Sequence, residues 1–158
     1  MKYEVRRRKD GKKAIFDENG KQISKWFDRI LEEGLVSGES KYYIAFKGNK
    51  VAIFDKDGNQ ITKWFDDIYP FGLVKGESNL YVAGENRRYA IFDVNGNRIS
   101  EWYSWIWSFG LVEGESNLYI AKKDGKEAIF DINGKRITDW FSYICSEGLV
   151  RGQTPYYL

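Results

Sequence analysis

Short apolar runs alternate with polar turns along the whole chain, and this pattern predicts β-strands rather than helices. Residues 118–121 form one apolar run, and residues 128–130, followed by Asp131, form the next. Between them lies Asp124-Gly125, a pair that favours a two-residue hairpin turn. A second turn, Asn133-Gly134, leads into residues 136–138, and its glycine supplies the positive φ that the turn needs. Each such segment is therefore predicted to contain three or four short strands.

The same pattern recurs at a fixed period. Ala-Ile-Phe-Asp begins at Ala14, Ala52, Ala90 and Ala128, with 38 residues between successive starts. Other columns of the repeat are also invariant: Trp26, Trp64, Trp102 and Trp140; Tyr43, Tyr81, Tyr119 and Tyr157; and Gly-Leu-Val beginning at Gly34, Gly72, Gly110 and Gly148. A fixed period of this kind indicates a repeat architecture in which neighbouring units share their core. We expect a single repeat domain, residues 1–158, with units of approximately 1–38, 39–76, 77–114 and 115–158.

The segment around each invariant tryptophan is ambiguous. In the first unit, Ser24 and Gly34 stand where the N-cap and the C-terminal glycine of a short helix would be. In the second unit, Pro70 limits any such helix. In the third unit, aromatic residues alternate with other residues, as they do on one face of a strand. Irregular or extended structure is the favoured interpretation and a helix of one or two turns is the alternative. Gly-Leu-Val is expected to begin a further short strand.

Differences between the units favour an open array over a closed ring. Glu33 and Glu147 in the outer units stand where the inner units have Phe71 and Phe109, and Arg7 aligns with an alanine column. Open arrays need polar terminal units, whereas a ring gives every unit the same neighbours. The two ends of the chain also fall in the same columns, so both would compete for one place in a ring. The sequence therefore predicts an all-β fold of four 38-residue β-hairpin or meander repeats in an open, solenoid-like array. A closed four-bladed β-propeller-like ring is the alternative.

The composition is that of a folded protein with balanced charge. The chain has 158 residues, of which 42% are hydrophobic and 17% aromatic, and its 25 basic and 23 acidic residues give a net charge of +2. This balance implies no nucleic-acid or membrane partner for the chain as a whole. The apolar runs are too short for a transmembrane helix. Cys145 is the single cysteine, and no apolar region follows the basic start of the chain, so we expect a cytoplasmic protein.

No constellation of residues suggests catalysis. The chain has no histidine, which removes the commonest general base and metal ligand, and Cys145 has no partner that would activate it. Residues 55–59 resemble part of a calcium loop, but no glutamate follows at the required place. The aspartate of each Ala-Ile-Phe-Asp is instead expected to bond the backbone of the turn that follows it. We therefore expect no enzymatic activity, no cofactor and no metal site.

One stretch of the repeat carries a resemblance to a known family. In the second unit the matching residues, in order, are Asp55, Gly58, Trp64-Phe65-Asp66, Ile68 and Gly72-Leu73-Val74. The pattern resembles the bacterial WG, or KWG, β-repeat family, and the resemblance covers the whole chain. The Trp-Gly pair that names the family is replaced here by Val51-Ala52, Tyr89-Ala90 and Glu127-Ala128. The resemblance implies a non-catalytic β-repeat of unknown ligand.

The clearest departure from the repeat is aromatic and is centred on the third unit. Trp105 and Trp107 are the tryptophans outside the invariant column, and they belong to an i, i+2 series of rings. The candidate binding residues are Trp105, Trp107, Phe109 and Tyr103 of this series, with Tyr69 and Phe71 in neighbouring columns of the second unit. Such a strip suits a protein partner or self-association, with carbohydrate binding as the alternative. The same rings are equally suited to packing between neighbouring units.

The first thirteen residues are the most basic segment, with seven basic and two acidic side chains. A segment of this charge is able to bind nucleic acid, and such binding weakens steeply with salt. The favoured interpretation is an edge strand that its charge protects from pairing with another chain. Nucleic-acid binding is therefore the less favoured function.

Overall fold

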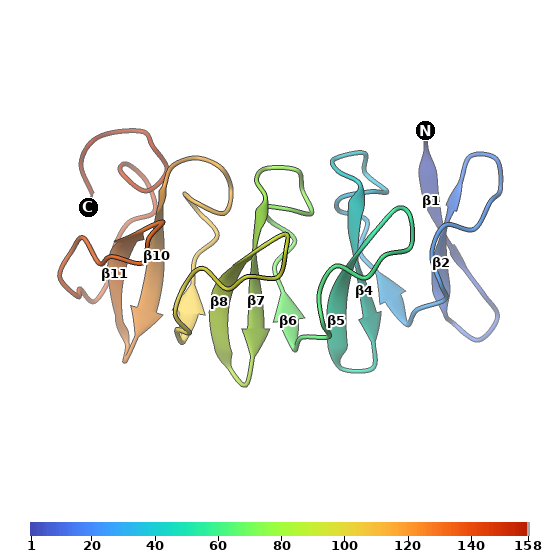
Figure 1. The fold of residues 1–158 in the computed structure, drawn as a ribbon, viewed down its shortest axis with the longest axis horizontal. Helices are drawn as coiled ribbons and strands as arrows, with labels where there is room; N and C mark the ends of the chain where they lie inside the picture. The colour runs from blue at the N-terminus through green and yellow to red at the C-terminus, as the bar shows by residue number, and fades with distance from the viewer. Residues whose placement is uncertain (158) are drawn as a thin grey trace.

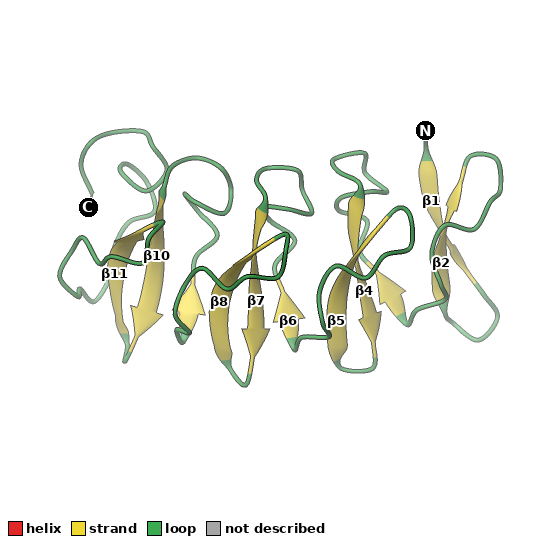
Figure 2. Ribbon diagram, in the orientation of Figure 1, coloured by secondary structure: helices red, strands yellow, loops and turns green. Residues whose placement is uncertain are grey.

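The structure is a computed structural model that describes residues 1–157; Leu158 lies outside the described residues. Within residues 1–157 the chain forms eleven β-strands and no helix (Figure 2). The strands are β1 (Tyr3–Arg7), β2 (Lys13–Asp17), β3 (Arg29–Ile30), β4 (Tyr42–Lys47), β5 (Lys50–Asp55), β6 (Asp67–Ile68), β7 (Leu80–Glu85), β8 (Arg88–Asp93), β9 (Trp105–Ile106), β10 (Leu118–Lys123) and β11 (Lys126–Asp131). The all-β prediction is confirmed. The described part of the chain accordingly has no helix able to cross a membrane.

The strands form four antiparallel sheets that follow one another in a row, with the two termini at opposite ends (Figure 1). The first sheet is β1-β2, the second β3-β4-β5, the third β6-β7-β8 and the fourth β9-β10-β11. We call the contacts between successive sheets the first, second and third junctions. The prediction of an open array is confirmed, and the alternative closed ring does not form.

Each three-stranded sheet takes its first strand from the preceding sequence repeat. In the third sheet, Ile68 of β6 lies opposite Ala83 of β7, although the two residues belong to different repeats. β3 and β9 pair with β4 and β10 in the same way. β1 has no such partner on its other side, so it is the edge strand expected from the basic N-terminal segment. Successive units are thus joined by backbone hydrogen bonds as well as by packing.

Alternate residues of each strand pack against opposite neighbours in the row. In β7, Tyr81 and Ala83 share a core cluster with Ile44 of the second sheet, whereas Val82 shares one with Tyr119 of the fourth. None of these five side chains is more than 1% exposed. Fully burying a Val or Ile side chain stabilises a fold by about 1.5–3 kcal/mol. Each junction therefore holds because both faces of a sheet are apolar.

The invariant aromatic columns belong to this scaffold. Phe54 has its ring centroid 5.8 Å from Trp64, 5.7 Å from Tyr43 and 5.0 Å from Phe27 of the preceding unit. The edge-on contact between phenylalanine and tryptophan recurs in the other units at 5.9, 5.8 and 5.8 Å. Such aromatic pairs contribute about 0.5–1.5 kcal/mol beyond the area that they bury. Recurrence of these columns therefore reflects packing.

The aspartate of Ala-Ile-Phe-Asp organises the following turn, as predicted. In the third unit, Asp93 Oδ1 accepts hydrogen bonds from the backbone N–H groups of Asn95 and Asn97, both at 2.9 Å. The backbone and side-chain hydrogen bonds from Asn97 hold the pKa of Asp93 below its ordinary value. Gly96 within this turn has a φ of +87°, the conformation expected for its column.

The Gly-Leu-Val triplets do not begin a strand, which corrects the expectation from the sequence; they lie in turns. Gly72 has a φ of +85°, and a Cβ at this position would lie 2.2 Å from the carbonyl oxygen of Leu80. The N–H of Leu73 donates to the same oxygen at 2.8 Å. The loop passes so close to the next strand that only glycine fits.

The alignment of the first unit also needs a correction. Arg6, not Arg7, lies opposite Ala14 in the register that pairs Ala45 with Ala52. The reason is one additional residue in the first hairpin, because five residues separate Arg7 from Lys13 whereas four separate the equivalent Phe46 from Val51. A charged residue still replaces the alanine, so the first unit remains a polar end.

Candidate functional site

The structure brings three of the six predicted binding residues together. The ring centroids of Tyr69 and Trp105 are 5.6 Å apart, and those of Trp105 and Trp107 are 5.7 Å apart. Tyr69 directly follows β6 of the third sheet, whereas Trp105 lies in β9 of the fourth. The three rings therefore meet at the third junction.

A fourth ring, which the sequence pattern did not single out, completes this group. Tyr89 in β8 lies 5.5 Å from Tyr69 and 4.9 Å from Trp105, between ring centroids. Its hydroxyl donates a hydrogen bond to Asp67 Oδ2 at 3.1 Å. Tyr69, Tyr89, Trp105 and Trp107 are called the aromatic cluster below.

A glycine makes room for the cluster. Gly84 lies opposite Tyr89 in the pairing of β7 with β8, and a Cβ at Gly84 would lie 2.6 Å from Cε1 of the tyrosine ring. The equivalent positions of the neighbouring sheets hold Phe46 and Lys122. An isolated glycine within a strand often marks a close approach of this kind, and this signal was available in the sequence.

The other predicted residues lie elsewhere, so the i, i+2 series does not form one strand face. β9 contains only Trp105 and Ile106. Tyr103 is 8% exposed and packs 5.1 Å from Phe130, in the way that Phe27 packs on Phe54. It belongs to the core.

Phe71 and Phe109 lie apart from the cluster and next to cations. Phe71 is 36% exposed, and the Lys75 ammonium lies 5.3 Å from the centre of its ring. Phe109 is covered in the same way by the Arg151 guanidinium at 4.9 Å. Neither ring extends the surface that Trp105 and Trp107 form.

The aromatic cluster holds two buried polar atoms without a partner among the described residues. These are the Trp105 indole N–H and the Tyr69 hydroxyl. Burial, helped by the nearby Tyr89 and Asp67, raises the pKa of Tyr69, so its phenol stays neutral. A buried group without a hydrogen bond costs about 1–3 kcal/mol. The cluster is thus held by packing, and the buried hydroxyl of Tyr119 in the scaffold likewise has no partner among the described residues.

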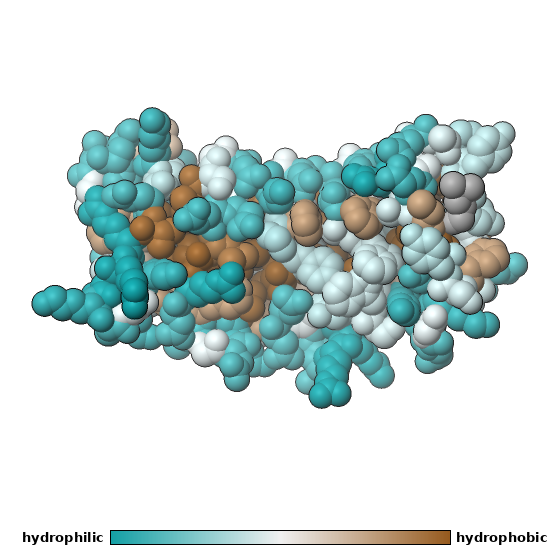
Figure 3. All heavy atoms as spheres, turned by 180° about the vertical axis from the view of Figure 1, so that it is seen from behind, coloured by the Kyte–Doolittle hydropathy of each residue, from teal (hydrophilic) through white to brown (hydrophobic). Residues whose placement is uncertain are grey.

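Two hollows share Ser104, and the first of them is lined by cluster residues. The first has a volume of about 360 Å³ and is lined by Ser104, Trp105, Trp107 and Lys122. The second has a volume of about 530 Å³ and is lined by Asn86, Arg87, Arg88, Trp102, Tyr103, Ser104, Lys123 and Asp124. One wall of the combined surface is aromatic and the other is predominantly basic. Figure 3 shows apolar and neutral side chains in a band between hydrophilic rims, on the face opposite to that of Figure 1.

The basic residues of the N-terminal segment are partly engaged within the first unit. The Arg6 guanidinium lies 2.6 Å from Glu4 and 4.5 Å from the centre of the Phe16 ring. Arg8 pairs with Asp10 at 2.6 Å and lies over the Trp26 ring at 4.7 Å. These contacts cover the end of the array and leave less charge for an external partner.

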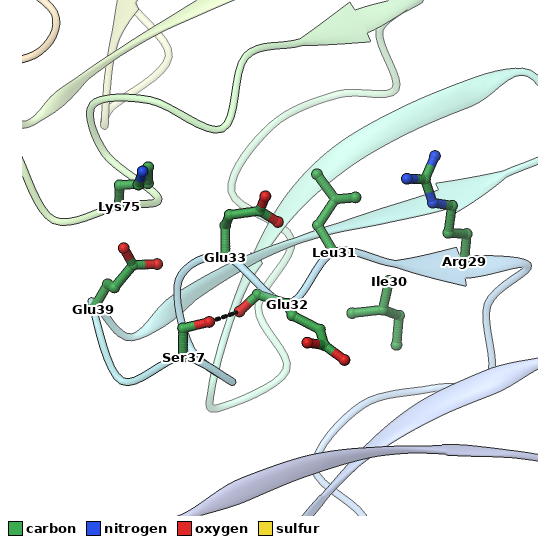
Figure 4. A pocket seen from close by; sticks show the side chains of 8 residues that line it. All are labelled: Arg29, Ile30, Leu31, Glu32, Glu33, Ser37, Glu39 and Lys75. Carbon is green, nitrogen blue, oxygen red and sulfur yellow. Dashed lines mark hydrogen bonds between the residues drawn. The ribbon is translucent and has the colours of Figure 1, made fainter.

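A further hollow lies near the loop that follows β3 and has a volume of about 480 Å³ (Figure 4). Its acidic lining residues are Glu32, Glu33 and Glu39. Figure 4 shows the Glu32 and Glu33 side chains pointing to opposite sides of the backbone, while the Ser37 hydroxyl donates to the Glu32 carbonyl oxygen at 2.8 Å. Within residues 1–157, no group of three or more candidate ligands is placed to hold a metal ion. The carboxylates of this hollow thus do not converge as a catalytic pair would.

Fold and site together define an open β-repeat array with one aromatic, partly basic surface. No protein-family model matches the chain, and a search of curated proteins finds no match. The chain is similar to a solved structure described as "KlHsv2 with loop 6CD replaced by a Gly-Ser linker", with a TM-score of 0.49 and 12% sequence identity. The match covers 82% of this chain and 46% of that one, so the chain spans less than half the length of that structure.

Proposed function

We propose that the protein is a non-enzymatic binding or scaffolding module that holds a protein partner on its aromatic cluster. The observation that carries this proposal is the placement of Trp105 and Trp107, half-buried, beside an open hollow. Tryptophan and tyrosine dominate the energetic centres of protein interfaces because they bury a large area at a low entropic cost. The resemblance to WG repeats supports a module without an active site.

The use of tryptophan elsewhere in the chain supports a separate role for these two rings. The invariant tryptophans each pack edge-on against the phenylalanine of Ala-Ile-Phe-Asp. Trp105 has no counterpart in that scaffold contact, since its column holds Arg29 and Asp67 in the first two units. Trp107 leaves part of its ring exposed and packs against the core cluster of Ile120, Ile129, Ile144 and Val150.

The ring geometry favours protein over carbohydrate. Trp105 crosses Trp107 at 71° and Tyr89 at 66°, so the rings cover one another and present no continuous flat platform. A sugar ring that stacks on an aromatic ring needs such a free face, whereas a protein side chain inserts between crossed rings. Nucleic-acid binding by the N-terminal strand is less favoured because Arg6 and Arg8 already have partners.

The test replaces Trp105→Ser and Trp107→Ser together. Wild-type protein and the variant are compared in selections from a displayed peptide library and in sedimentation velocity runs for self-association. We expect the variant to lose peptide enrichment or self-association. The control changes Tyr143→Ser and Tyr156→Ser, two rings that are 71% and 74% exposed and lie outside the cluster. If the tryptophan variant enriches the same peptides and sediments like the wild type, the proposal is wrong.

A further inference from the structure

The third junction lacks a carboxylate that the first two junctions share. Lys12 Nζ lies 2.7 Å from Asp28 Oδ1, and Asp28 Oδ2 also accepts the Gly48 N–H at 2.7 Å. One repeat later, Lys50 pairs with Asp66, which accepts the Asn86 N–H at 2.9 Å. Each aspartate therefore neutralises a cation on one hairpin and ties it to the next hairpin.

At the third junction the same columns hold Arg88 and Ser104. The Ser104 hydroxyl donates instead to the carbonyl oxygen of Lys122 at 2.7 Å. Within residues 1–157, no ion pair or side-chain hydrogen bond involves the side chain of Arg88. At the third junction the cation of the repeat is thus present as Arg88, but serine replaces the aspartate that balances it elsewhere.

A second arginine is held beside it in an unfavourable backbone conformation. Asn86 and Arg87 form the hairpin turn between β7 and β8, with φ angles of +54° and +63°. The equivalent turn of the fourth sheet uses Asp124 and Gly125, at +52° and +78°. A non-glycine residue in the left-handed region is strained, and strain of this kind concentrates at functional positions. Arginine at this place in the turn has a cost for folding, and within residues 1–157 its side chain makes no ion pair or hydrogen bond that offsets it.

The charged groups around the two hollows are predominantly positive. Arg87, Arg88 and Lys123 line the larger hollow and Lys122 the smaller, while Asp124 is the only acidic residue lining either of them. The nearby Glu85 is already paired with Lys63 at 2.9 Å. A ligand in this position therefore meets cations on one side and the aromatic cluster on the other.

We propose that this surface selects an acidic peptide segment of the protein partner, with an apolar side chain against Trp105 and Trp107 and flanking carboxylates against Arg87, Arg88 and Lys122. The inference rests on the proposed function and adds the chemistry of the partner. A carboxylate of the peptide occupies the place that Asp28 and Asp66 fill at the other junctions. Guanidinium groups bind carboxylates through paired, charge-assisted hydrogen bonds, which gives orientation as well as affinity.

The extent of the positive surface favours a peptide over a nucleic acid. Single-stranded nucleic acids need a positive groove that follows the backbone over several nucleotides and rings with free faces for stacking. Here the cations along the hairpin edge are neutralised by Asp28 at the first junction and by Asp66 at the second. Along this hairpin edge, the described cations without a carboxylate partner are thus at the C-terminal end of the row, beside rings that cross one another, whereas the basic N-terminal segment lies at the opposite end.

The experiment uses three fluorescent probes on the full chain. One is a decapeptide with Leu-Phe at its centre and four glutamates on each side, the second has glutamine in place of each glutamate, and the third is a single-stranded oligothymidylate. We expect wild-type protein to bind the acidic peptide about tenfold more tightly than the glutamine peptide at low salt, with the difference shrinking as salt is added.

Ser104→Asp restores the missing carboxylate and is the decisive variant. It should weaken binding of the acidic peptide by about tenfold and leave the glutamine peptide unchanged, because aspartate then competes for Arg88. Ser142→Asp is the matched control, since it adds the same charge in the same column one repeat later, outside both hollows. Its affinity for the acidic peptide should match that of the wild type. Circular dichroism of both variants checks folding, which aspartate already permits at Asp28 and Asp66.

The outcomes separate this inference from the proposed function. The inference is overturned if the wild type binds the two peptides with equal affinity, or if Ser104→Asp binds the acidic peptide as tightly as the wild type does. This holds even when the Trp105→Ser, Trp107→Ser variant loses binding of both peptides. If that tryptophan variant binds both peptides like the wild type, the proposed function itself fails. Tighter binding of the oligothymidylate than of the acidic peptide also overturns the inference and assigns the surface to nucleic acid.

Discussion

The second and third junctions have nearly the same core and different rims. At the second, Phe65 packs 5.3 Å from Phe92, and at the third, Tyr103 packs 5.1 Å from Phe130. At the rim of the second, Asp66 joins two hairpins, whereas Ser104 at the third bonds only the backbone of its own sheet. The two junctions are therefore alike where they determine folding and differ where they meet solvent.

The units of a repeat array can differ at the rim of a junction while they share the same core. Each junction must bury the same apolar columns, because a unit cannot cover its own faces. Residues at the rim bury less apolar surface than those of the core, so substitutions at the rim leave the array intact. The loss of an aspartate, the gain of two tryptophans and a strained arginine all fall at the rim of the third junction.

Removing the shared ring of the core is the largest effect that we predict. Phe65→Ala and Tyr103→Ala should each destabilise the array by about 3–5 kcal/mol, because each leaves a cavity in a packed junction. Phe141→Ala is the control, since this ring of the same column is 40% exposed and should cost much less. Urea denaturation measures all three. If Tyr103→Ala lowers the free energy of unfolding clearly less than Phe65→Ala does, the two cores are not equivalent.

Gly84→Ala is the next largest change and acts on the third junction alone. The added methyl group would lie 2.6 Å from the Tyr89 ring, so the ring must move and disturb Trp105. We expect a loss of about 1–3 kcal/mol, the usual cost of overpacking, together with a change in tryptophan fluorescence. Arg7→Ala, at the equivalent register position of the first sheet and far from the cluster, is the control and should leave the fluorescence unchanged. Wild-type stability in Gly84→Ala would show that Tyr89 is not packed on this backbone.

Arg87→Gly should stabilise the protein while weakening its binding. Glycine adopts a φ of +63° without strain, so the gain should be about 1 kcal/mol. The reciprocal change, Gly125→Arg in the equivalent turn, should cost a similar amount. Affinity of the Arg87→Gly variant for the acidic decapeptide should fall at the same time. A variant that is more stable and binds equally well would leave the strained turn without a functional reason.

The sequence was sufficient for the repeated hairpins and for the turns after Ala-Ile-Phe-Asp. The fixed period, the turn glycines and the Ala-Ile-Phe-Asp columns predict strands, hairpins and an open row because each repeats one local solution four times. The Gly-Leu-Val loop was misassigned as a strand because its conformation is determined by contact with the following strand, which lies outside the local pattern.

The site was predicted only in part, for two physical reasons. Trp105, Trp107 and Tyr69 stood out by type, but Tyr89 joins them through the register that places it over Gly84, and pairing registers are not visible in apolar spacing alone. The pattern along the chain groups Tyr103 with Trp105 and Trp107, whereas the structure packs it against Phe130 in the core. The column of Tyr103 holds Phe27, Phe65 and Phe141, and an aromatic residue in every unit indicates the shared core rather than a site.

The smallest predicted effect concerns Asp66, a carboxylate that is present at the rim of the second junction and has no counterpart at the third. This effect depends on pH. Hydrogen bonds from the Lys50 side chain and from the Asn86 N–H hold the pKa of Asp66 below its ordinary value of 3.8. A depressed pKa means that the carboxylate stabilises the fold above its ordinary pKa, and that this stabilisation is lost as the pH falls through the lower, folded value. Asp66→Asn should therefore be slightly less stable than the wild type near neutral pH, and the stabilities of the two proteins should converge in acid.

Ser104→Asp should show the opposite sign over the same range, slightly more stable than the wild type near neutral pH, if Arg88 supplies the missing partner. Thermal unfolding across this range measures both, and a Ser104→Asp curve parallel to that of the wild type at every pH would show that the third rim cannot be closed by the residue that closes the other two.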